Sequence, residues 1–323
     1  MRTKYNVITI GGITEDVFFT VDDYLMINNQ KDLLHKKMLA FEYGAKIGVP
    51  EVTCASGGGA ANASVAFSRL GFRSAIIGVV SHDSRGRNLV HNLLKNRVRT
   101  NLLEINDQTQ TGVSFILVKP GNDHIVFTHR GANDFLKLNS HQLQAIKKTE
   151  WIYLTSLSED WQPVLKAVFS NAKLVAWNPG RLQIMAGLKA LTPFLEKTEV
   201  LICNKDEAIE LVSSASGNAR ASSLNNIKFL LRSLKKFVFG TVIITNGEQG
   251  SMLYDGQKIY QQKIIKVRKV VDTTGVGDAF GASYVAGLKI FQGNKAKALA
   301  LAAKNSSAVV GQFGAQTGLM ARR

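Results

Sequence analysis

The second half of this chain alternates short apolar strands with helical segments, and this alternation restricts the fold more than any other feature. Strands separated by helices pair in parallel through right-handed crossovers. A chain of 323 residues is long enough to bury one large core in this way. The pattern therefore predicts an α/β fold with a mostly parallel sheet. Its buried-type strands are expected at 151–154, 174–177, 200–203 and 241–245.

One predicted hairpin does not fit the alternation. Thr111 to Val118 and His124 to Thr128 flank the strong turn sequence Pro120-Gly121-Asn122-Asp123. We group this hairpin with the extended segments near 17–21 and 39–55 as a separate flap. The chain is thus expected to be one core domain, residues 1–323, with an inserted β lid.

The remaining predicted elements belong to the core. They are a strand at 6–10 that ends in Gly11-Gly12, a glycine turn and helix at 57–71, a strand at 74–80, a hairpin near 241–261 with its turn at Asp255-Gly256, and helices at 278–291 and 294–310.

The charge balance favours anionic ligands. The chain has 40 Lys+Arg against 24 Asp+Glu, a formal charge of +16, which attracts nucleotides, phosphosugars or nucleic acid. The basic residues are scattered, with no run of five and no aromatic RNA-binding signature, so we expect no nucleic-acid partner.

No membrane signal and no zinc or redox motif is visible in the sequence. No apolar run reaches the roughly 18 residues of a membrane helix, and the start lacks a signal-peptide core. Cys54 and Cys203 have no CxxC neighbour and are expected to be reduced core residues. We therefore expect a cytoplasmic protein without a membrane partner.

The stretch from Val271 to Phe280 carries the most chemical information. A β-rich run ends at Val271, a glycine turn follows, and a helix is expected to begin at Asp278. Amides at a helix N-terminus attract anions, and glycines let an anion approach them. An acid beside such an anion site fits phosphoryl transfer, because Asp278 can accept a hydroxyl proton while the amides stabilise the transferring group.

Two other interpretations of this stretch stay open. Asp278 can simply cap the helix, a position that Asp favours. Gly275, Gly277 and Gly281 also fit a GxGxxxG variant of the dinucleotide-binding loop, although that loop normally opens the first βαβ unit. A P-loop is excluded, since no GxxxxGK[ST] occurs in the sequence.

These residues resemble a known family. Asp272-Thr-Thr-Gly-Val-Gly-Asp278 is similar to the C-terminal signature of the ribokinase (PfkB) family of carbohydrate and nucleoside kinases. Gly57-Gly58-Gly59-Ala60-Ala61-Asn62 resembles its N-terminal signature. The resemblance implies a three-layer α/β/α core with a small β-sheet lid, here at about 16–55 and 111–129. It also implies transfer of the γ-phosphate of ATP, with Mg²⁺, to a hydroxyl of a sugar or sugar-like substrate. A nucleoside or a phosphosugar is the alternative acceptor.

The resemblance assigns roles around the transfer step. Asp278 is the general base, and we expect the helix N-terminus to keep it ionised at neutral pH. The amides of Gly275, Val276 and Gly277 form the anion hole. Without the resemblance, Asp278 is equally compatible with a helix cap. The substrate residues implied are Asp16, Gly57, Gly58 and Asn62, although Asp16 also suits a turn and Asn62 a helix start.

The resemblance assigns further residues to nucleotide and metal. Asn204-Lys205-Asp206-Glu207 is similar to the family's Asn-x-x-Glu motif, which organises Mg²⁺ and phosphates, with Glu207 on the metal side. The same two residues suit a helix capping box. Thr245, Gly247 and Gly250 resemble the nucleotide-binding turn, which is also compatible with a plain hairpin.

The assignments are less specific for three other features. Thr273 is assigned to the nucleotide, and Asp272 with Gly314-Ala315 to the monovalent cation, such as K⁺, that some members bind. Arg130 can contact the phosphate of a phosphosugar or lie in a solvated loop. A homodimer is compatible with the family.

Overall fold

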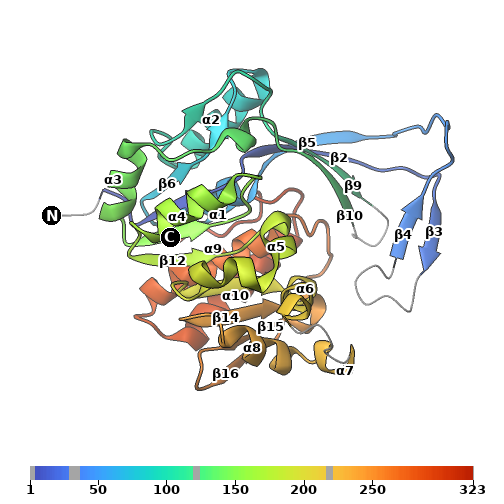
Figure 1. Ribbon diagram of the computed structural model, residues 1–323. Coiled ribbons are helices and arrows are strands. Elements are labelled where there is room, and N and C mark those ends of the chain that lie inside the picture. The colour runs from blue at the N-terminus through green and yellow to red at the C-terminus, as the bar shows by residue number, and fades with distance from the viewer. Residues whose placement is uncertain (1–3, 29–36, 119–123, 216–220, 323) are drawn as a thin grey trace.

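The computed structural model describes residues 4–28, 37–118, 124–215 and 221–322, without the side chains of residues 37 and 221 (Figure 1). Its central sheet has eight strands in the order β16-β15-β14-β13-β12-β11-β1-β6. Their bounds are β1 Val7–Ile10, β6 Ser74–Ile77, β11 Trp151–Leu154, β12 Leu174–Trp177, β13 Val200–Asn204, β14 Thr241–Thr245, β15 Ser251–Tyr254 and β16 Ile259–Gln262. The six strands from β6 to β14 pair in parallel, and β15 and β16 add two antiparallel strands at one edge.

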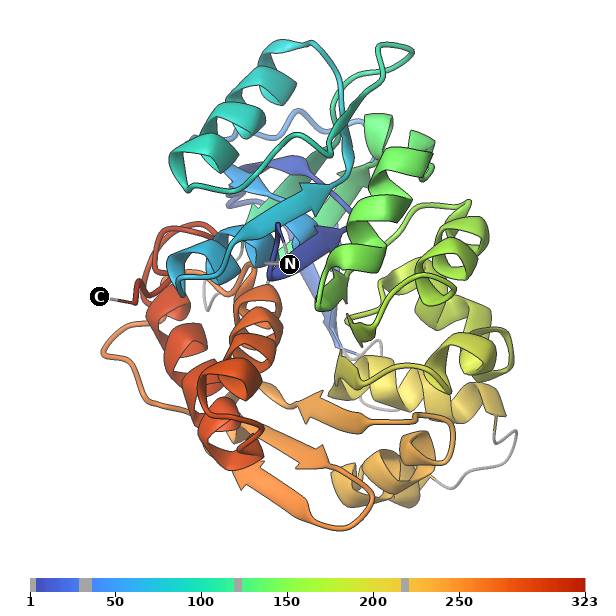
Figure 2. The ribbon, with the colours of Figure 1, turned by 90° about the vertical axis from the view of Figure 1, so that its left-hand side faces the viewer.

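Helices cover both faces of this sheet. One face packs against α1 Gly59–Arg69, α2 Ser84–Lys95, α9 Val276–Ile290 and α10 Lys295–Val310. The other packs against α3 Ser140–Lys148, α4 Trp161–Phe169, α5 Arg181–Leu195, α6 Lys205–Ala215 and α8 Ile227–Lys235, with α7 Ala221–Leu224 beside α8. In Figure 2, α9 and α10 (red) lie beside α1 (blue) on their side of the sheet.

The strand sequences explain the two covered faces. Alternate side chains of a strand point to opposite faces, so a strand buried on both sides must be apolar throughout. In β11, Ile152 and Leu154 join the core under α3 to α8, whereas Trp151 and Tyr153 join the core under α1, α9 and α10. The near-continuous apolar runs in the sequence are therefore the direct cause of the three-layer arrangement.

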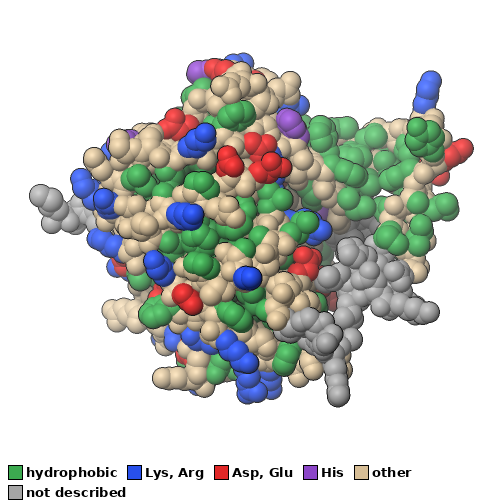
Figure 3. Space-filling model, viewed as in Figure 1, with side chains coloured by type: hydrophobic (Ala, Val, Ile, Leu, Met, Phe, Trp, Pro, Cys, Tyr) green, Lys and Arg blue, Asp and Glu red, His purple; other side chains and the backbone are tan. Residues whose placement is uncertain are grey.

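A second, smaller sheet has four strands in the order β10-β9-β2-β5. The strands are β2 Thr14–Phe19, β5 Val52–Gly57, β9 Val113–Val118 and β10 His124–His129. β3 Leu25–Asn28 and β4 Lys37–Ala40 form a separate hairpin that extends from this sheet (Figure 1). Large apolar side chains such as Val52, Phe115 and Phe127 are exposed here, and Figure 3 shows hydrophobic side chains gathered over this part of the molecule.

Four further short elements lie within the described residues. They are the parallel pair β7 Val79–Val80 and β8 Glu104–Ile105, and the 3₁₀ turns Gly131–Phe135 and Gly247–Gln249.

Most predicted elements are confirmed. The four strands of the second half, the 241–261 hairpin and the paired segments at 111–118 and 124–128 form as expected, and the last two helices lie within two residues of their expected bounds. The predicted turn at Pro120–Asp123 lies outside the described residues. Among the residues described, no helix is long and apolar enough to cross a bilayer.

Three expectations are wrong. The β-rich run that ends at Val271 is not a strand, because residues 263–271 are irregular and several of them line a cavity. The helix of the glycine motif begins at Val276 rather than at Asp278. Both cysteines are free, but only Cys203 is buried, since Cys54 lies exposed on β5.

Candidate active site

Functional residues gather where the parallel strands end. The carboxyl ends of parallel strands lie at one edge of a sheet, and ligands of α/β proteins collect there. Gly11-Gly12 follows β1, Thr155 follows β11, Asn204 ends β13 and Thr245 ends β14. The second sheet approaches the same edge, because β2 follows β1 after only three residues.

The glycine motif forms a left-handed turn into α9. Gly275 is the N-cap with φ 70°, and a Cβ at this position would lie 2.2 Å from the Cβ of Ala315. Both the backbone conformation and the space therefore require glycine. The Val276 amide makes a long 3.4 Å bond to the Thr273 carbonyl, and the first helical bond runs from the Ala279 amide to the Gly275 carbonyl. The amides before that bond point out of the helix end, as an anion site requires.

Asp278 lies in the first turn of α9 and does not cap it. The cap residue is Gly275, which has no side chain to bond the helix, so the capping interpretation of Asp278 is wrong. Its Oδ2 instead accepts a 2.9 Å hydrogen bond from the Asn62 side-chain amide on α1. Two segments 216 residues apart in the chain thus meet at one carboxylate.

The expectation that Asp278 stays fully ionised at neutral pH is also wrong for the unliganded site. Burial raises the pKa of Asp278 to about 7, against the lowering by the Asn62 hydrogen bond, and the negative charges of Asp16 and Glu207 raise it further. Desolvation of the charged form outweighs the helix end here. A carboxyl that titrates near neutral pH is well matched to proton transfer at that pH.

Asp16 faces the same region from β2. Its side chain is buried, and the Thr14 hydroxyl donates to its Oδ1 at 3.0 Å, with a second hydrogen bond from Ser114. Burial raises the pKa of Asp16 to about 6 despite these bonds. A Cβ on Gly57 would lie 1.9 Å from Asp16 Oδ2, so only glycine admits this carboxylate at the start of α1. Gly58 and Asn62 follow at the same helix start.

Asn204 and Glu207 begin α6 as a reciprocal pair. The Glu207 amide donates to Asn204 Oδ1 and the Asn204 amide donates to Glu207 Oε2, each at 2.8 Å. The capping-box interpretation is therefore correct, although it leaves the second carboxylate oxygen of Glu207 available. Burial, followed by repulsion from Glu210 and Asp206, raises the pKa of Glu207 to about 7.

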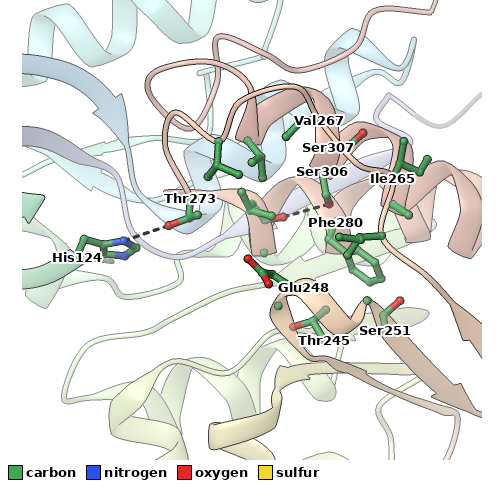
Figure 4. A pocket seen from close by; sticks show the side chains of 18 of the residues that line it. His124, Thr245, Glu248, Ser251, Ile265, Val267, Thr273, Phe280, Ser306 and Ser307 are labelled. Carbon is green, nitrogen blue, oxygen red and sulfur yellow. Dashed lines mark hydrogen bonds between the residues drawn. The ribbon is translucent and has the colours of Figure 1, made fainter. Parts of the chain in front are cut away.

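A cavity of about 1240 Å³ adjoins this cluster (Figure 4). Its lining includes residues of the 245–251 turn, of the 262–270 segment and of the start of α9, and α10 contributes Ser306 and Ser307. Of the residues predicted for the nucleotide and the anion hole, those that line it are Thr245, Gly247, Gly250, Thr273, Val276 and Gly277. Asn204 does not line the cavity, although Asp206 in the same helix turn does.

Comparison with known proteins agrees with this geometry. The profile of the pfkB family of carbohydrate kinases matches residues 29–322. The chain belongs to the pfkB carbohydrate kinase family. It is 27% identical over 271 residues to a ribokinase of Bacillus subtilis, covering 82% of this chain and 85% of the relative. It is 26% identical over 249 residues to a nucleoside kinase of Methanocaldococcus jannaschii, covering 76% of each.

The fold of this pfkB-family chain also matches solved structures. A structure of Arabidopsis thaliana ribokinase with ribose and ATP aligns with TM-score 0.78 at 19% identity, covering 98% of this chain and 96% of that one. The expected α/β fold of the ribokinase type and the expected class of enzyme, a carbohydrate kinase, are confirmed. The dinucleotide-loop interpretation of the glycine motif is excluded by the same finding.

Asp272 ties the family's glycine motif to the C-terminal loop. Its Oδ1 accepts from the Thr274 amide at 2.8 Å and its Oδ2 from the Gly314 amide at 2.9 Å. The expected proximity of Asp272 and Gly314 is confirmed. Each carboxylate oxygen keeps a further lone pair, and the cation role of Asp272 stays a prediction.

Several residues of this kinase site were not predicted. His124 Nδ1 lies 3.3 Å from Thr273 Oγ1 and connects β10 to the glycine motif (Figure 4). Gln316 donates to Asn62 Oδ1 at 2.9 Å. Neither residue belongs to a spacing pattern, so only the packing of distant segments could identify them. Arg130, for which a phosphosugar contact and a solvated loop were both open, donates to the Leu157 carbonyl at 3.4 Å.

Proposed function

We propose that this chain transfers the γ-phosphoryl group of ATP to a hydroxyl of a sugar or sugar-like substrate, with Asp278 as the general base. The observation that carries the proposal is the position of Asp278. It is a carboxyl with a pKa of about 7, held in the first turn of α9 beside outward-pointing amides and next to a large cavity. An anion site and a proton acceptor side by side are what in-line phosphoryl transfer to a hydroxyl requires.

ATP is proposed to occupy the cavity. A Cβ added to Gly277, at the start of α9, would meet no atom within 4 Å. Phosphate oxygens therefore have room beside the Gly277 amide. Thr245, Gly247, Gly250 and Thr273 line the same space and form the proposed nucleotide contacts. A solved relative of the same fold contains ribose and ATP, which supports this placement.

The sugar is proposed to lie between Asp16 and Asp278. A carboxylate accepts hydrogen bonds from two neighbouring hydroxyls, and Asp16 is held for this by Thr14 and Ser114. Gly57 leaves room for the Asp16 carboxylate and Gly58 packs against the Gly12 backbone, and both are proposed to lie beside the sugar with Asn62, which donates to the base. The second sheet, with segments at about 16–55 and 111–129, is proposed to be the lid over this substrate.

The residues present fit a divalent cation beside the phosphates. Repulsion by other carboxylates contributes to the raised pKa values of Asp16, Glu207 and Asp278. The negative charges in the described part of the unliganded site are therefore not balanced by nearby cations. Mg²⁺ prefers oxygen ligands and retains several waters, and when bound it would neutralise charge on the transferring phosphate. Glu207 is the residue proposed to hold it through its free oxygen. Activation by K⁺ through Asp272 remains a prediction.

A nucleoside is the second candidate acceptor. The relative from Methanocaldococcus jannaschii is a nucleoside kinase of similar identity to the ribokinase relative. Both acceptors present a hydroxyl to the same base, so the mechanism is unchanged.

A screen of sugars, phosphosugars and nucleosides with Mg-ATP, measuring ADP release, tests the proposal. One acceptor should give turnover at least 10²-fold above the Asp278→Asn variant, which retains the side-chain size but cannot accept the proton. Equal turnover by the two proteins on the best acceptor would refute Asp278 as the base.

We also propose a cytoplasmic location, where ATP is plentiful, and a homodimer. The exposed apolar side chains of the second sheet support the dimer, because an uncovered patch of this kind marks interaction surfaces. Sedimentation of the purified chain as a monomer at micromolar concentration would exclude it.

A further inference from the structure

A continuous chain of side-chain hydrogen bonds ends at Asp278. Asn62 on α1 donates to Asp278 Oδ2 at 2.9 Å, and Gln316 in the C-terminal loop donates to Asn62 Oδ1 at 2.9 Å. Asn92 on α2 donates to Gln316 Oε1 at 2.7 Å. Four separate parts of the fold, α9, α1, the C-terminal loop and α2, are therefore connected through amide groups alone.

The chain continues to a cation. Asn96, at the end of α2, donates to Asn92 Oδ1 at 3.3 Å, and Arg69 Nε donates to Asn96 Oδ1 at 3.0 Å. A guanidinium can only donate, and an ionised carboxylate can only accept. The two ends therefore fix the direction of every bond between them. We call this series, Arg69, Asn96, Asn92, Gln316 and Asn62, the amide relay.

The direction matters most at Asn62. An asparagine side chain can be turned by 180°, exchanging its donor and its acceptor, at little steric cost. In one orientation Asn62 gives Asp278 a donor, which favours the carboxylate, and in the other it presents an oxygen, which favours the protonated acid. Asn62 and Gln316 are both buried, so water does not compete for these bonds. Gln316 is the group that decides between the two orientations.

We propose that Gln316 is a positioning residue for the transfer reaction: through the amide relay it holds the Asn62 amide with its NH₂ group toward Asp278. The inference rests on the proposed role of Asp278 as the base, and no contact of Gln316 with the substrate is involved. Loss of the Gln316 donor frees Asn62 to turn, and Asp278 then takes up its proton at higher pH and is a poorer acceptor at neutral pH.

No charged side chain described around Asp278 can take over the effect of the Asn62 hydrogen bond on its protonation. The titratable side chains that face it are Asp16 on β2, Glu207 on α6 and Tyr153 on β11. None of them is a cation. The neighbouring helix α10 contributes the neutral Asn305 and Ser306, which bond to Ser283 and to the Val276 carbonyl. Among the described side chains around Asp278, the Asn62 donor is therefore the one that favours the ionised base in the unliganded site.

The loop itself is held independently of the Gln316 side chain. Arg69 Nη1 donates to the backbone carbonyls of Gln316, Thr317 and Leu319 at 2.8, 3.3 and 3.1 Å. A Gln316→Met change, which keeps length without donors, therefore leaves these anchors in place. Asn92→Leu is a second variant, which leaves Gln316 intact and breaks the relay one step further from the base. Thr317→Val is the matched control, because the Thr317 side chain is exposed on the same loop.

Two measurements test the proposal. The ¹³C carboxyl signal of Asp278, assigned by its loss in Asp278→Asn, is titrated in the substrate-free protein, and kcat is measured against pH. In Gln316→Met we expect the titration midpoint and the acidic limb of kcat to rise by about one pH unit, with kcat recovering at alkaline pH. Asn92→Leu should give a smaller rise, and the double variant should match Gln316→Met, because both act through one bond. Thr317→Val should titrate as the wild type.

An unchanged midpoint in Gln316→Met would overturn the proposal, as would a kcat lowered by the same factor at every pH, which indicates a structural role only. Effects of Asn92→Leu and Gln316→Met that simply add would also overturn it, since the relay would not be their common route. The carboxyl titration needs no turnover, so it tests Gln316 separately from the role of Asp278, which the activity of Asp278→Asn tests.

Discussion

Replacing Asp278 with asparagine should make the protein more stable and far less active. The half-buried carboxyl is desolvated by its surroundings and repelled by Asp16 and Glu207, and these effects raise its pKa from 3.8 to about 7. An asparagine removes the charge, and its Oδ1 can still accept the hydrogen bond from Asn62. The same change removes the proton acceptor. Stability and activity should therefore move in opposite directions.

The size and pH dependence of the gain follow from the pKa of Asp278. A rise of about three units corresponds to about 4 kcal/mol at 1.36 kcal/mol per unit, and the partial exposure of Asp278 lowers this to about 2–4 kcal/mol. Between pH 4 and pH 7 the folded protein binds a proton that the unfolded chain does not, so wild-type stability rises as pH falls through this window. Above pH 7 both states are ionised and the full penalty is present. The advantage of the variant should be largest at pH 8 and fall to about a third of that value at pH 5.

Thermal unfolding of both proteins without ligands, at pH 5 and pH 8, measures this difference. We expect a Tm gain on the order of 5 °C at pH 8 and a clearly smaller one at pH 5. Turnover on the best acceptor should fall about 10²–10⁴-fold. A variant that is less stable than the wild type at pH 8, or a gain that does not depend on pH, would refute the assignment of a buried, charge-strained carboxylate to this position.

Three further changes probe the rest of the site. Glu207→Gln should raise the Mg²⁺ concentration needed for half-maximal activity several-fold, because a charge near the ion's waters is lost; an unchanged Mg²⁺ titration would leave Glu207 as a capping residue. Gly57→Ala should raise the KM for the acceptor at least tenfold, because its Cβ would lie 1.9 Å from Asp16 Oδ2, whereas Gly48→Ala, where nothing lies within 4 Å, should have no effect; normal KM in Gly57→Ala would contradict this. Gly277→Ala should keep or raise the Tm, since its Cβ also meets nothing within 4 Å, yet lower kcat/KM for ATP, and full activity would show that phosphate does not pass there. Hydrogen exchange in 113–118 should slow when the acceptor binds if the second sheet closes as a lid, and identical exchange with and without it would count against closure.

The sequence by itself determined the architecture and the identity of the chemistry. Apolar strands such as β11 and β12, separated by helices, have few ways to bury both faces other than in a covered parallel sheet. The residues of the glycine motif, with Asp278 at the start of a helix, pointed to phosphoryl transfer because helix ends and glycines act locally. These inferences needed only neighbouring residues along the chain.

Only the tertiary structure decided how the site is tuned. The start of α9 at Val276 depends on Gly275 packing against Ala315, and the pKa of Asp278 depends on burial and on Asn62 from α1. The contact between Gln316 and Asn62 joins residues 254 positions apart, and no local pattern encodes it. Desolvation and long-range hydrogen bonds arise only when distant segments pack together, so the protonation of the base is a property of the fold rather than of the motif that contains it.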